Sequence, residues 1–63
     1  MVQELARRTA DGIDVRLLWD SVADLLTVRV ADRREGTRFV VPAPRESALE
    51  VFNHPFAHAA IAR

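Results

Sequence analysis

The two histidines of the sequence, His54 and His58, lie four positions apart. On a continuous helix their imidazoles would face the same side, as the paired ligands of zinc proteases do. Pro55 stands between them, disfavours helical geometry at His54, and inside a helix would collide with the carbonyl of Val51. We also expect no acidic side chain beside the pair. We therefore predict a structural or solvent-exposed role and no metal or other cofactor, with a metal-binding or enzymatic role at the pair as an open alternative.

Three arginines form a second candidate site. Arg16, Arg29 and Arg38 have the same outward parity in three successive predicted strands, which would align them as a basic stripe. Such a stripe suits phosphates or the carboxylates of a partner. Asp14 and Thr27 share the face, however, and a polar outward face is ordinary for a sheet with one covered side. The three arginines are candidate anion contacts, and a solvated polar face is the favoured interpretation.

Nucleophilic and acid-base catalysis find little support. Ser21 and Ser47 lie in a predicted loop and at a helix start without a glycine-framed turn, and two glycines cannot build a glycine-rich phosphate loop. The loop carboxylates have no histidine or apolar pocket that would set up acid and base roles, and they are interpreted as turn formers. These are Asp20, Asp24, Asp32 and Glu35. We predict no catalytic residue and no enzymatic activity.

Strands must position these side chains. Apolar and polar residues alternate along residues 13–19, 25–31 and 37–41, which is typical of strands with one buried face. The links are short and polar, and Gly36 suits the positive φ of a hairpin loop, so neighbouring strands run antiparallel. The Asp-Gly pair at 11–12 favours a tight turn and predicts a leading edge strand, although its alternation is poor.

A helix follows the predicted sheet. Pro44 suits the first turn of a helix, whereas Ser47 with Glu50 fits a capping box and would start the helix later. The apolar stripe at helical spacing consists of Ala48, Leu49 and Phe52, with Val51 at its flank. We predict a helix over about 44–53 and a short helical tail over 55–62.

The predicted fold is α+β: an antiparallel three- to four-stranded β-meander, (β)βββα, covered on one face by a C-terminal helix. Residues 1–63 form a single small domain, with the sheet over about 3–41. The covered face should contain Ile13, Val15, Leu17, Trp19, Leu26, Val28, Val30, Phe39 and Val41.

The uncovered face also has apolar side chains, at Leu18, Leu25, Val40 and Ala31. Adjacent exposed apolar residues tend to mark protein contacts. A chain of 63 residues without cysteine has little intrinsic stability, so self-association, as a homodimer, is the simplest prediction. The candidate interaction residues are Leu18, Trp19, Val40, Phe52 and Phe56. Trp19 fits a core position as well, with its indole N–H bonded near the edge.

Composition limits the possible partners. Nine basic residues, all arginine, balance nine acidic residues, so the long-range attraction to phosphate that supports nucleic-acid binding is not expected. The longest apolar runs are far below the roughly 20 residues that span a bilayer, and the N-terminus lacks the apolar core of a signal peptide. We predict a cytoplasmic protein without a membrane partner.

One resemblance spans most of the chain. The residues that carry it are Asp-Gly at 11–12, Leu-Leu-Trp at 17–19, Ala-Leu at 48–49 with Phe52, and His-Pro-Phe-Ala at 54–57. Together they resemble a pattern in short actinobacterial proteins to which no function is assigned. The resemblance implies a bacterial, stand-alone protein and no particular chemistry, in agreement with a composition typical of a GC-rich genome.

The leading prediction is a small non-catalytic protein-interaction module that acts as a homodimer or with a partner protein. The first alternative is a nucleic-acid-associated regulator or antitoxin-like protein that uses the arginine stripe. The second alternative is the metal-binding or enzymatic role at the histidine pair.

Overall fold

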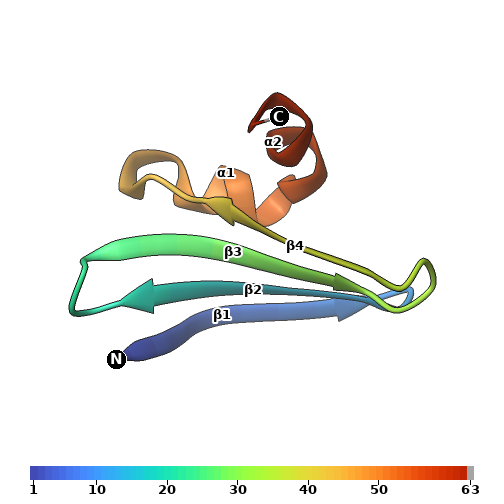
Figure 1. The fold of residues 1–63 in the computed structure, drawn as a ribbon, viewed down its shortest axis with the longest axis horizontal. Coiled ribbons are helices and arrows are strands. Elements are labelled where there is room, and N and C mark those ends of the chain that lie inside the picture. Colours follow the sequence, from blue (N-terminus) through green and yellow to red (C-terminus); the bar gives the residue numbers. More distant parts are fainter. Residues whose placement is uncertain (63) are drawn as a thin grey trace.

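The computed structural model describes the backbone of residues 1–62 and the side chains of residues 1–59. In chain order its elements are β1 (Val2–Ala10), β2 (Ile13–Asp20), β3 (Leu25–Asp32), β4 (Thr37–Pro42), the 3₁₀ turn η1 (Arg45–Ser47), α1 (Ala48–Asn53) and α2 (Pro55–Ala62). The strands form one antiparallel sheet in the order β1-β2-β3-β4, and both α-helices lie on the same side of it (Figure 1). The predicted α+β fold, a β-meander followed by a C-terminal helix, is confirmed.

Aspartates and glycines shape the three turns of the meander. Asp11 and Gly12 both have positive φ, which is the conformation of a tight two-residue hairpin turn. At the next two turns, the carboxylates of Asp20 and Asp32 each accept hydrogen bonds from two backbone N–H groups that follow them. Each aspartate thus replaces backbone partners that the chain loses as it leaves the strand.

Strand β1 contains a β-bulge that changes which side chains face outward. Val2 and Glu4 pair with Asp20 and Leu18, but beyond the irregularity between Glu4 and Ala6 it is Arg7 and Thr9 that pair with Arg16 and Asp14. Cross-strand partners share a face of the sheet, so even-numbered residues face outward before Leu5 and odd-numbered residues after it. The bulge explains why residues 3–9 alternate poorly.

The core lies between the sheet and the helices. Val15, Leu17, Val28, Val30 and Val41 supply its sheet side and are buried, as predicted. Ile13, Leu26 and Phe39 are only partly buried against this core. Cross-strand pairs such as Val15 with Val30 and Val28 with Val41 place β-branched side chains next to each other, which favours the sheet.

The helical segment differs from the expectation for residues 44–53. Ser47 has φ −126° and makes no capping hydrogen bond through its side chain, so a 3₁₀ turn ends there and α1 begins at Ala48. From that start the buried positions are Ala48, Val51 and Phe52, at i, i+3 and i+4. Leu49, predicted in the stripe, is 68% exposed, whereas Val51, placed at its flank, is 1% exposed.

Arg8 fastens α1 to the sheet from the inner face of β1. Its guanidinium donates hydrogen bonds to the carbonyl of Phe52 at 2.9 Å and to that of Asn53 at 3.3 Å, and it lies 5.4 Å from the centre of the Phe52 ring. The last carbonyls of a helix have no partner within the helix, and a cation there also interacts favourably with the helix dipole. One arginine therefore supplies partners for the end of α1.

The second helix starts directly at Pro55, after His54 leaves helical geometry with φ −133° and ψ 55°. Phe56 packs edge-on against Phe39 of β4, with ring centres 5.2 Å apart. This contact places α2 over β4, while α1 lies against β2 and β3. No helix in the part of the chain that the structure describes has both the length and the apolar character needed to cross a membrane.

Candidate functional site

The side of the sheet opposite the helices, here called the outer face, is where most of the predicted site residues lie. Cross-strand pairing assigns to it Val2, Glu4, Arg7 and Thr9 of β1; Asp14, Arg16, Leu18 and Asp20 of β2; Leu25, Thr27, Arg29 and Ala31 of β3; and Arg38, Val40 and Pro42 of β4. Neither α1 nor α2 covers this face (Figure 1). It therefore presents charged and apolar side chains together, without a second layer.

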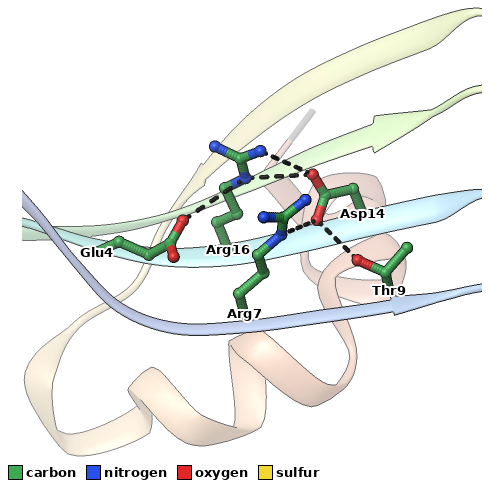
Figure 2. A network of polar contacts seen from close by, with 5 residues as sticks. All are labelled: Glu4, Arg7, Thr9, Asp14 and Arg16. Carbon is green, nitrogen blue, oxygen red and sulfur yellow. Dashed lines mark hydrogen bonds and ion pairs between the residues drawn. The ribbon is translucent and has the colours of Figure 1, made fainter.

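A buried carboxylate organises the outer face near β1 and β2. Asp14 is 6% exposed, and its Oδ1 accepts hydrogen bonds from Arg7 Nε at 3.1 Å and Thr9 Oγ1 at 3.3 Å. Its Oδ2 accepts from Arg16 Nε at 3.1 Å, and Arg16 also reaches Glu4 Oε1 at 3.6 Å (Figure 2). The side chains of β1 thus hold Asp14 and Arg16 of the neighbouring strand β2 in place.

Burial and pairing act in opposite directions on the pKa of Asp14. Burial raises the pKa of its carboxyl, but hydrogen bonds from Arg7 and Arg16 and the positive charges of both arginines outweigh burial, so the pKa lies below the ordinary value of 3.8. The carboxylate is ionised at neutral pH and fully paired. Its role is to fix two arginines in place, because a carboxylate with a lowered pKa is a poor general base near pH 7.

A groove of about 540 Å³ opens on the outer face beside this network, towards the turn between β3 and β4. We call it the arginine groove. Four arginines line it: Arg16, Arg29, Arg33 and Arg38. Ala31 contributes only a methyl group between Asp14 and Arg38, its cross-strand neighbours, and this small side chain leaves room between the longer ones. Val40 lies on the groove wall opposite Arg29.

The arginines of the groove differ in their pairing. Arg16 is bound to Asp14 and Glu4, as described above. Within the part of the chain whose side chains are described, the guanidinium groups of Arg29, Arg33 and Arg38 have no hydrogen bond or ion pair. In contrast, Arg34 pairs with Asp32 and Arg45 pairs with Asp24. The arginines without a partner are thus gathered in one groove.

The predicted anion contacts are therefore brought together, with one difference and one addition. Arg16, Arg29 and Arg38 line the same groove, but two carboxylates already neutralise Arg16. Arg33 belongs to the groove and was missed, because it lies in a turn outside any strand alternation. Arg7, which binds Asp14 beside the groove, was not predicted on the outer face because the bulge reverses the parity of β1.

The predicted interaction residues separate into exposed and buried groups. Val40 is 56% exposed and Phe56 is also exposed, whereas Leu18 is half-buried on the outer face. Trp19 is half-buried on the inner face, and its indole N–H donates to Asp24 at 3.0 Å. Phe52 is 9% exposed because it packs in the core beneath Arg8, and its prediction as a surface contact is wrong.

The histidines lie on the helical side of the molecule, away from the groove. His54 occupies the break between α1 and α2, and His58 Nε2 lies 3.6 Å from Glu50 Oε2. The expectation of no acidic side chain beside the pair is wrong, since Glu50 stands one helical turn before His54. No set of three or more histidine, cysteine, aspartate or glutamate side chains suited to a metal ion occurs among the described residues.

Comparison with models of known protein families, with curated proteins and with solved structures finds no match for this chain.

Proposed function

We propose that the protein is a small non-catalytic interaction module that binds another protein chain through the outer face of its sheet. The observation that carries the proposal is the composition of this face, where exposed Val40 and Leu25 lie on the same surface as unpaired arginines. Exposed apolar groups favour contact with another protein, and arginine is enriched in protein interfaces. The helices cover the inner face of the sheet, as is normal for a sheet with one covered face, so the outer face is the one open to a partner.

The edges of the sheet are less suited to binding than its face. An edge strand attracts a partner strand through its unpaired backbone groups, and proteins block such pairing with bulges, charges and prolines. The β1 edge has a bulge and the charged Glu4 and Arg7. The β4 edge has Arg38 and ends with Pro42, which lacks an N–H group to donate. Side chains of the outer face, and not backbone pairing, are therefore the proposed means of recognition.

A second copy of this chain is the first partner to test. A chain this short gains stability from association, and identical patches complement each other around a two-fold axis. The outer face also contains both signs of charge, with Glu4 and Asp20 near one end of the strands and Arg29 and Arg38 near the other. A face with separated charges of both signs is compatible with binding to a copy of itself.

Site-specific photo-crosslinking tests the proposal. A photo-reactive amino acid replaces Val40 on the outer face or, as control, Leu49 on α1, and the protein is irradiated in its native cells. Leu49 is the more exposed of the two, so random encounters would favour the control. We expect a crosslinked species from position 40 only; a mass of twice 7.1 kDa identifies a homodimer and any other mass a different protein. Equal yields from both positions, or no product from position 40, would refute the proposal.

The arginine groove also favours a second candidate, a nucleic-acid-associated or antitoxin-like regulator. Three guanidinium groups that have no partner among the described side chains lie in one groove, and they suit phosphate contacts. Glu4, Asp14 and Asp20 on the same face and a net charge of zero weigh against it, because a polyanion is repelled by exposed carboxylates. Binding of generic duplex DNA or RNA that weakens steeply with added salt would favour this candidate.

A further inference from the structure

We infer that the arginine groove is a binding site for a carboxylate group, and that its occupant is an acidic segment of a protein partner. The inference deepens the proposed function, on which it rests for the identity of the occupant. It concerns a pocket of defined residues, whereas the proposed function concerns the whole outer face.

Arginines with and without polar partners are unevenly distributed over the molecule. Arg7, Arg8, Arg16, Arg34 and Arg45 each have a polar partner inside the molecule. Among described side chains, the arginines without one are those at 29, 33 and 38, and all three line the same groove. Arginine is the side chain best suited to bind planar carboxylates through two parallel hydrogen bonds. The groove thus concentrates the guanidinium donors that have no partner among the described side chains.

The two carboxylates that line the groove already have hydrogen-bond donors. Asp14 accepts from Arg7, Thr9 and Arg16. Asp32 accepts from the backbone N–H groups of Arg34 and Glu35 and lies 3.7 Å from the guanidinium of Arg34. Neither is therefore available to neutralise Arg29 or Arg38, and the local charge remains positive although the whole chain is neutral.

The arginines of the groove repel one another. Arg16 and Arg29 are direct cross-strand partners, and like charges in this position destabilise a sheet. Asp14 and Glu4 compensate the charge of Arg16, but nothing in the described side chains compensates that of Arg29. An anion seated over Ala31, between Arg29 and Arg38, would supply the missing charge. The volume of 540 Å³ lies within the range of about 300–1,000 Å³ that is typical of ligand pockets.

The distribution of charge on the outer face favours a short anionic segment as the occupant. The basic side chains lie in the half of the outer face nearer the turn between β3 and β4, and Glu4 and Asp20 lie in the other half. A long polyanion would meet these carboxylates, whereas one or two acidic side chains would not. Val40 on the groove wall adds an apolar contact that a peptide can use and a free inorganic ion cannot.

A titration followed by NMR of the ¹⁵N-labelled full chain tests the inference. The probe is the blocked peptide acetyl-Glu-Val-Glu-amide, and the matched controls are acetyl-Gln-Val-Gln-amide and inorganic phosphate at equal ionic strength. We expect saturable shifts at the Ala31 and Arg38 amides and the Arg29 Nε with the acidic peptide, and binding at least about tenfold weaker for both controls. Phosphate binding as tightly as the acidic peptide would overturn the assignment of a peptide occupant.

Two variants complete the design. R29Q/R38Q removes exposed groups that have no partner among the described side chains, and it should weaken peptide binding at least about tenfold. R45Q replaces an exposed arginine outside the groove and should leave peptide binding unchanged. Thermal melts check that all variants fold. Equal affinity of R29Q/R38Q and the original chain would overturn the inference. Peptide binding in the groove together with absent crosslinking at position 40 would refute the proposed function and the identity of the occupant but not the carboxylate site itself, so the two failures are distinguishable.

Discussion

The contact of Arg8 with the end of α1 gives the sharpest prediction for stability. Substitution R8A removes a hydrogen bond of 2.9 Å to the Phe52 carbonyl, a longer one of 3.3 Å to the Asn53 carbonyl, and the contact of the guanidinium with the Phe52 ring. No other side chain is hydrogen-bonded to the carbonyls of α1 among the described residues. The variant therefore leaves a helix of six residues without its anchor to β1.

The loss of stability expected in R8A follows from these contacts. A hydrogen bond from a charged donor contributes about 1.5–3 kcal/mol to the free energy of unfolding, and the partial exposure of Arg8 places it at the lower end. The cation–π contact adds about 0.5–1 kcal/mol. The total of about 2–2.5 kcal/mol compares with roughly 3–9 kcal/mol for the whole chain, at about 0.05–0.15 kcal/mol per residue. R8A should thus remove about a fifth or more of the stability.

Urea denaturation followed by far-UV circular dichroism measures this loss. The matched control is R45A, which breaks an exposed ion pair to Asp24 and should cost less than about 1 kcal/mol. R8K keeps the charge but lacks the planar fork that reaches both carbonyls, and should lie between R8A and the original chain. If R8A costs no more than R45A, the assignment of Arg8 as the anchor of α1 is refuted.

Three further predictions concern the outer face, the core and one turn. Because the pKa of Asp14 is lowered in the folded protein, its contribution to stability is present above about pH 3.8 and is lost as the pH falls through the lower folded-state pKa. Urea midpoints at pH 7 and pH 3 should therefore differ less in D14N than in the original chain. An equal difference in the two proteins would contradict the hydrogen-bond network around Asp14. V51A should lower the free energy of unfolding by about 1.5–3 kcal/mol and L49A by under about 0.5 kcal/mol, because only Val51 of the two is buried. Similar losses in the two variants would contradict the orientation of α1. G12A should lower the free energy of unfolding by about 1–2 kcal/mol in the same denaturation assay, since Gly12 has φ 79° and an added Cβ would lie 3.0 Å from Arg34 Cγ. An unchanged urea midpoint would contradict this turn geometry.

The meander could be predicted because its signals are local. Alternation along β2, β3 and β4 identifies the buried valines, and Asp11 with Gly12 identifies the first turn. Strand β1 was harder to predict, because the bulge after Glu4 reverses the parity of its outward-facing residues. The sequence therefore did not identify Arg7 and Thr9 as neighbours of Asp14. A single inserted residue leaves no composition signal, so only the pairing itself reveals it.

The helical layer and the site depended on contacts between distant residues. Leu49 and Val51 have similar hydrophobicity, and a shift in the start of α1 decides which of them is buried. Arg8 lies 44 positions from Phe52, and no local pattern links the two. The stripe of Arg16, Arg29 and Arg38 followed from parity, but which of these arginines is already neutralised depends on Glu4 and Asp14 across strands. The resemblance to short actinobacterial proteins stays a prediction.

The order of the strands also has a consequence for how fast the protein forms. Each strand pairs with its neighbour in the chain, so every hairpin closes a loop of a few residues at small entropic cost. The bond of Arg8 to Phe52 joins segments far apart in the chain and becomes possible only after the hairpins exist. Its removal should therefore accelerate unfolding and leave the refolding rate nearly unchanged.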